Sequence, residues 1–142
     1  MTYNQIVKKI TDLLESNKMI STVRFSSPNE WLGWTEMPVM PVANFVLNNG
    51  QLNAGREIVY SVTFWFLDKS GIEGEFEQQV INDQLLIAND IISALRNDQT
   101  ISTDINISWT AISEKFEDYL SGVTTTFNIS LTGKFGKCDF PL

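Results

Sequence analysis

Apolar residues recur at helical spacing in two parts of the chain. Near the N-terminus, Ile6, Ile10 and Leu14 fall on one face, and lysines and acids fall on the other, which predicts an amphipathic helix over residues 3–17. A longer helix is predicted over residues 75–97, where apolar side chains fill about half of the circumference. That face is wider than one sheet contact needs, so we expect it to meet a second partner as well, either the first helix or a neighbouring subunit. Leu86 alone falls in the middle of the polar arc.

Alternation of apolar and polar residues predicts five strands. They cover residues 20–25, 42–48, 58–67, 103–111 and 123–133. The last two strands have one apolar face, with Ile105, Ile107 and Trp109 together on the first of them, which is typical of antiparallel sheets with one face in water. The strand at 58–67 is apolar on both faces near Trp65, which predicts a central position with cover on both sides. We therefore expect one α+β domain over residues 1–142, an antiparallel sheet of about five strands with two helices on one face.

Two segments do not follow either period. Residues 26–41 contain three prolines and one glycine, which exclude regular structure, but they also carry large apolar side chains that must pack on something. This segment either folds as a lid over the open sheet edge or lies as an arm on a neighbouring subunit. Residues 48–56 are polar with two glycines and predict a hairpin loop. The candidate interface residues are Trp31, Trp34, Met37, Met40 and Leu86, and the candidate loop residues are Asn49, Gln51, Asn53 and Arg56.

Composition restricts the classes of partner. The 142-residue, 16.1 kDa chain has a net charge of -7 and no run of basic residues, which argues against nucleic-acid binding by the isolated chain. It has one cysteine and no histidine, so it can form no intramolecular disulfide and none of the usual zinc sites. No apolar stretch approaches the roughly 18–20 residues of a membrane span, and we expect a soluble protein made in a reducing cytoplasm.

Candidate chemistry is sparse. The absence of histidine excludes Ser/His/Asp and Cys/His nucleophile systems, and the glycines match no phosphate-binding loop. Glu73, Glu75 and Glu77 lie together at the start of the long helix, where the helix dipole favours acidic residues by about 0.3–1 kcal/mol each. We therefore expect no enzymatic activity, no cofactor and no metal.

The order of elements resembles the tail-terminator, tail-completion and neck-ring proteins of tailed bacteriophages. An N-terminal helix precedes three strands, a long helix follows, and a final hairpin closes the sheet; residues 48–56 lie where that family carries a projecting loop. The resemblance implies a homo-oligomeric ring, with a hexamer expected, that ends tail-tube growth and joins the tail to the head connector. It implies a place in the virion, after assembly in the host cytoplasm, with the tail tube and portal-side proteins as partners. DNA would pass through the lumen without sequence-specific binding, and the candidate loop would face the lumen or the next ring.

Two other functions remain open from the residues alone. One is a small-molecule or peptide-binding module with a cavity between sheet and helices, lined by Trp65, Trp109 and Phe127. The other is a hydrolase that uses Glu73 or Glu75 as one of two carboxylates.

Overall fold

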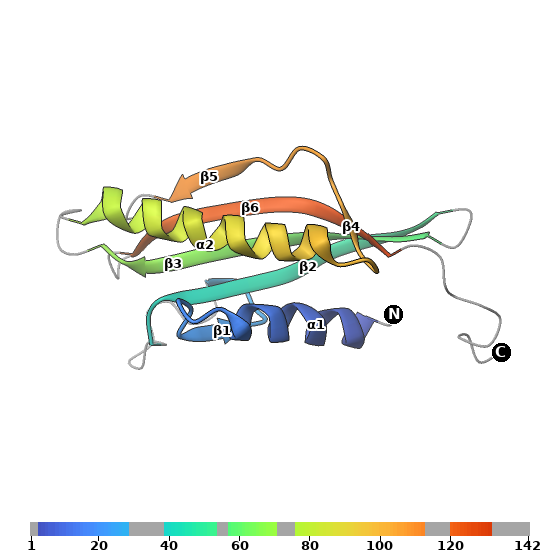
Figure 1. Ribbon diagram of the computed structural model, residues 1–142, viewed down its shortest axis with the longest axis horizontal. Helices are drawn as coiled ribbons and strands as arrows, with labels where there is room; N and C mark the ends of the chain where they lie inside the picture. The colour runs from blue at the N-terminus through green and yellow to red at the C-terminus, as the bar shows by residue number, and fades with distance from the viewer. Residues whose placement is uncertain (1–2, 29–38, 54–56, 71–75, 113–119, 132–142) are drawn as a thin grey trace.

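The fold consists of one sheet with two helices on the same face (Figure 1). The computed structural model describes residues 3–28, 39–53, 57–70, 76–112 and 120–131. Its elements are α1 (Tyr3–Ser16), β1 (Thr22–Arg24), β2 (Val42–Asn53), β3 (Glu57–Lys69), α2 (Glu77–Asn97), β4 (Ser102–Thr103), β5 (Trp109–Ile112) and β6 (Leu120–Leu131). Both predicted helices and the α+β class are confirmed.

The sheet differs from the prediction in two respects. It has six strands in the order β1-β2-β3-β6-β4, with β5 also paired to β6, and it is mixed because β1 runs parallel to β2. A parallel pair needs a connection that carries the chain back along the sheet, and the segment between β1 and β2 has the dozen or so residues this requires. The expectation of a purely antiparallel sheet of about five strands was therefore wrong.

The sixth strand arises because the strand predicted at residues 103–111 is split into β4 and β5. Between them the Asp104 carboxylate accepts a hydrogen bond from the backbone N–H of Asn128 at 2.9 Å. The Arg96 guanidinium donates to the carbonyl oxygen of Ile105 at 2.9 Å. These side chains take the place of strand-to-strand bonds, so the backbone leaves the ladder between the two short strands.

The main core lies between the sheet and the helices. Phe64 is fully buried, and its ring stacks on Phe45 of β2, Phe66 of β3 and Phe127 of β6 with centroid separations of 6.0, 5.7 and 5.7 Å. Both helices cover this layer with buried aliphatic side chains, which are Ile6, Ile10 and Leu14 from α1 and Ile87, Ala88, Ile91 and Leu95 from α2. The helical periodicity in the sequence therefore reports a single shared core.

A second, smaller cluster lies on the opposite face of the sheet. Leu67 is fully buried there, and Met40 and Trp65 pack against the cluster, whose buried members are Val42, Leu67, Ile112 and Leu120. Since β3 lies between β2 and β6, the prediction of a central strand covered on both sides near Trp65 is confirmed.

The β2–β3 hairpin extends further than predicted. Pairing continues to Asn53 opposite Glu57, so Asn49, Gln51 and Asn53 belong to a strand and not to a loop. A register shift at Asn48 marks a β-bulge, and its side-chain amide donates to Thr63 Oγ1 at 2.6 Å. In Figure 1 this hairpin reaches beyond the ends of both helices.

Gly122 marks a close approach between the two central strands. A Cβ atom at this position would lie 1.8 Å from the carbonyl oxygen of Phe66, which is backbone and cannot rotate away. We therefore expect Gly122→Ala to lower the free energy of unfolding by about 3 kcal/mol, the upper end of typical overpacking costs. Chemical denaturation measures this change.

The matched control is Gly50→Ala in the same sheet, where the added Cβ would meet Val59 O at 3.2 Å and the Tyr60 ring at 3.3 Å. Its effect should be much smaller. Equal stability of Gly122→Ala and wild type would contradict this account of the β3–β6 contact.

Candidate interaction surfaces

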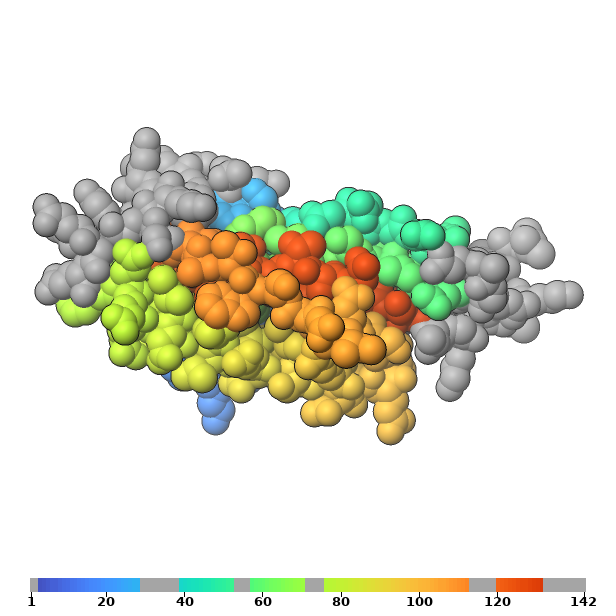
Figure 2. All heavy atoms as spheres, turned by 90° about the horizontal axis from the view of Figure 1, so that it is seen from above, coloured from blue at the N-terminus to red at the C-terminus, as the bar shows by residue number. Residues whose placement is uncertain are grey.

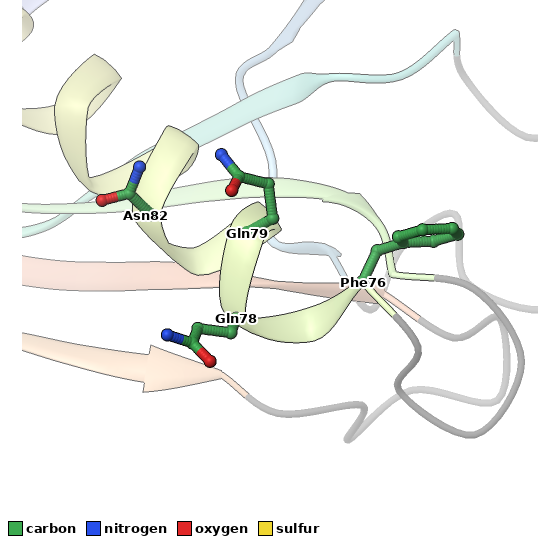
Figure 3. Close-up of a pocket in the computed structure, with 4 residues that line it drawn as sticks. All are labelled: Phe76, Gln78, Gln79 and Asn82. Carbon is green, nitrogen blue, oxygen red and sulfur yellow. The ribbon is translucent and has the colours of Figure 1, made fainter.

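Two exposed large apolar residues lie on α2 and at its N-cap, near neutral amides. Leu86 and Phe76 are each 56% exposed. An open hollow of about 330 Å³ at the start of the helix is lined by Phe76, Gln78, Gln79 and Asn82. Figure 3 shows these side chains fanning outward, not converging on one point. The described residues that line the hollow therefore offer hydrogen-bonding and apolar groups, and none of these four is an acid, a base or a nucleophile.

The neighbouring β5 side of the sheet adds further apolar surface. Ile105 is 89% exposed and Trp109 is 49% exposed. Two side-chain hydrogen bonds fix the backbone of this segment. Arg96 donates to the Ile105 carbonyl, and Thr125 Oγ1 donates to the Ser108 carbonyl at 2.6 Å. Figure 2 shows residues 104–112 and α2 side by side on one surface. We call the surface formed by Leu86, Ile105 and Trp109 the α2–β5 edge.

The opposite margin of the sheet has its own apolar group. Met19 is 62% exposed, Val39 70%, Phe25 44% and Tyr3 45%. The Phe25 ring lies 6.4 Å from that of Tyr3 and 5.0 Å from that of the buried Phe45, so this group is continuous with the core. Thr22 Oγ1 donates to the Val39 carbonyl at 2.7 Å and holds the residues just before β2 against β1. We call the four exposed residues the α1–β1 edge.

The two edges are joined through the helices by an ion pair. Lys9 Nζ lies 2.6 Å from Asp98 Oδ2, and Lys9 also donates to Thr100 Oγ1 at 3.0 Å. Asp98 also accepts from the N–H and the hydroxyl of Thr100, at 2.8 and 2.6 Å. Burial alone would raise the pKa of Asp98, but the hydrogen bonds from Lys9 and Thr100 outweigh it and hold that pKa below its ordinary value.

A lowered pKa in the folded state means that ionised Asp98 stabilises the fold. The stabilisation is complete above the pKa of the unfolded chain, near 3.9, and is lost as pH falls through the lower folded pKa. We expect Asp98→Asn to cost about 1 kcal/mol at pH 7 and much less at pH 3. Thermal unfolding at the two pH values measures this difference.

Asp12→Asn is the control, because its pair with Lys8 is highly exposed, at 60% and 76% of the side-chain surfaces. It should change stability little at either pH. A loss at Asp98 that is the same at pH 3 and pH 7 would contradict the ion-pair account.

The pKa of Asp68 is shifted in the opposite direction from that of Asp98. Burial raises the pKa of its carboxyl, and the nearby Asp83 raises it further, while the N–H of Lys69, which donates at 2.8 Å, and the Lys69 charge lower it. Two carboxylates alone do not form a metal site, and no group of three or more potential metal ligands occurs among the described residues. Glu73 and Glu75, the candidate hydrolase residues, lie outside the described residues.

Because the folded pKa of Asp68 is raised, stability that is present at low pH is lost as pH rises through that pKa. Asp68→Asn keeps an oxygen for the Lys69 N–H and removes the charge, so we expect a higher melting temperature than wild type at pH 7 and no gain at pH 3. Asp90→Asn, on the exposed face of α2, is the control and should show no such gain. A lower melting temperature of Asp68→Asn at pH 7 would contradict this prediction.

The candidate interface residues from the sequence are distributed unevenly. Leu86 is exposed, whereas Met40 packs against the cluster around Leu67 and does not stand free. Trp31, Trp34, Met37 and Arg56 lie outside the described residues. Asn49 and Gln51 are exposed on β2, and the backbone of Asn53 pairs with Glu57. The structure thus brings no two of the candidate interface residues together among those it describes.

Sequence reasoning missed most of the exposed apolar residues. Alternation assigned Ile105 and Trp109 to the buried side of one continuous strand, and only the break at Asp104 shows why Ile105 turns outward. A carboxylate that accepts the hydrogen bond normally accepted by a strand carbonyl cannot be recognised from the hydropathy pattern. Met19 and Val39 lie in connections between elements, where no helical or strand periodicity predicts whether a side chain is buried or exposed.

No family model matches the chain, and no curated protein matches it. Within the described residues, no helix has both the length and the apolar character needed to cross a bilayer.

Proposed function

We propose that this chain is a non-enzymatic structural subunit of a ring at the head–tail junction of a tailed phage. The layout of elements supports it, because one N-terminal helix, a hairpin sheet and a long second helix share one core. The observation that carries the proposal is the placement of exposed large apolar side chains along two margins of the sheet. Such apolar surface is a general mark of protein–protein contact.

The proposed role is to end tail-tube growth and to dock the head connector. The β2–β3 hairpin suits contact with a neighbouring ring, since it reaches beyond both helices (Figure 1). Its exposed Asn49 and Gln51 are neutral. The sheet face opposite the helices also carries neutral hydroxyls and amides, with Thr63 and Thr126 hydrogen-bonded at 2.8 Å. A neutral wall lets DNA pass through the lumen without holding its phosphates.

The three residues expected to line a binding cavity do not lie together in the structure. Phe127 belongs to the core beneath the helices, Trp65 packs on the opposite face of the sheet, and Trp109 is half exposed at the edge. These three side chains cannot line one cavity between sheet and helices. We therefore propose the structural role alone.

Native mass spectrometry of the purified chain tests self-assembly. Six copies of a 16.1 kDa chain give a ring of about 97 kDa, and we expect this species or another closed ring to dominate at high concentration. Negative-stain images should show a central hole. In a second arm, the chain should cosediment with tail tubes of a phage whose genome encodes it.

A chain that stays monomeric at high concentration, and that also fails to cosediment with those tubes, would rule the proposal out. The control for the second arm is Gly122→Ala, which should lose cosedimentation in proportion to its loss of folded protein.

A further inference from the structure

We propose that Asn49, on the projecting β2–β3 hairpin, is a site of spontaneous deamidation in the folded protein. Its side-chain amide is converted to a carboxylate through a cyclic imide formed with the backbone of Gly50. The proposal concerns the chain itself and holds whether or not the chain forms a ring. Three observations carry it: the residue that follows Asn49, the exposure of the pair, and the limited support of the strand at this point.

The residue pair is unique in the chain. Asn49 is the only asparagine that precedes a glycine. In deamidation the backbone nitrogen of the following residue must reach the side-chain amide carbon, and glycine has no Cβ atom to obstruct that approach. The preceding asparagine, Asn48, is followed by Asn49 and lacks this advantage.

The reaction needs water alone as a co-reactant. The Gly50 nitrogen attacks Asn49 Cγ; the new C–N bond forms, the bond from Cγ to the amide nitrogen breaks, and ammonia leaves with the proton of the Gly50 N–H. Water then opens the imide. Attack at Cγ gives aspartate, and attack at the former backbone carbonyl carbon gives isoaspartate, in which the chain runs through the side chain. Nothing is oxidised or reduced.

The structure exposes this pair and supports it weakly. Asn49 and Gly50 are both exposed, so water reaches them. The register shift at Asn48 interrupts the ladder immediately before Asn49. On the outer side, β1 pairs only with residues 42–44 of β2, and no other described strand flanks Asn49 there. Leu52, further along the strand, is 79% exposed and adds little burial. Local opening of this part of the hairpin therefore costs less than opening of the core strands.

Deamidation changes the hairpin beyond Asn49. An isoaspartate adds one atom to the backbone, so the pairing that runs from Gly50 opposite Tyr60 to Asn53 opposite Glu57 loses its register. Both products also place a negative charge on a stretch of β2 that is neutral. The modification thus loosens the projecting end of the sheet and leaves the core under the helices unchanged.

Peptide mapping by mass spectrometry during incubation of the purified protein at pH 8 tests the site. We expect a mass increase of about 1 Da at Asn49, before any other asparagine reacts. An isoaspartyl methyltransferase should label the same peptide. The native protein should react more slowly than the chain in denaturant, because the hairpin must open before the Gly50 nitrogen can attack.

Two variants separate the chemistry from the stability of the fold. Gly50→Ala adds a Cβ atom next to the reacting nitrogen and should slow the reaction by about tenfold or more in denaturant, where no hairpin contributes. Asn49→Gln keeps an exposed amide but requires a larger ring, so it should show no mass change at this position.

Hydrogen exchange measures the structural consequence. The backbone amides of Val59 and Tyr60 should exchange faster in the modified protein than in fresh protein, whereas those of α2 should keep their rates.

Three results would overturn the proposal. These are earlier modification of another asparagine in the native protein, equal rates for Gly50→Ala and wild type in denaturant, and a native Asn49 that stays intact while the denatured chain reacts fully. Unchanged exchange at Val59 and Tyr60 would overturn the predicted loosening of the hairpin. None of these results depends on whether wild type forms rings, so failure here and failure of the proposed function are distinguishable.

Discussion

The stack of rings around Phe64 is the contact on which the rest of the fold depends. Phe64 lies on the central strand and meets Phe45 and Phe127 on the strands to either side, so one side chain links three strands. Offset ring pairs are worth about 0.5–1.5 kcal/mol each beyond the area they bury. Because α1 and α2 both cover this layer, its position also sets where each helix lies, and therefore where the two apolar edges emerge.

The sequence predicted what depends on regular periods. The bounds of α1 agree to within one residue and those of α2 to within two, and the two apolar faces of the strand around Trp65 correctly indicated cover on both sides. The errors occur where a side chain or a single residue interrupts the period. The Asp104 carboxylate splits one strand into two, and the bulge at Asn48 allows a glycine-bearing polar segment to continue as a strand.

The candidate surfaces were harder to predict than the fold. Leu86 was identified as an outlier on a polar helix face and is exposed as expected. Met40 was grouped with the other methionine and tryptophans of its segment, but it packs against the chain's own second cluster. Whether an apolar side chain in an irregular segment serves its own core or a partner depends on tertiary position, which spacing alone does not encode.

The pairing of β3 with β6 also has a consequence for the order of folding. Phe64 lies opposite Thr125, so the centre of the sheet joins segments about 60 residues apart, whereas the β2–β3 hairpin and α2 form from neighbouring residues. Distant pairings close slowly, because the intervening chain must be ordered before any contact repays that cost. Until β6 docks, β3 presents an unpaired edge with the apolar residues Trp65 and Leu67 on the face away from the helices. Slow docking of β6 therefore leaves this edge open to aggregation while the chain folds.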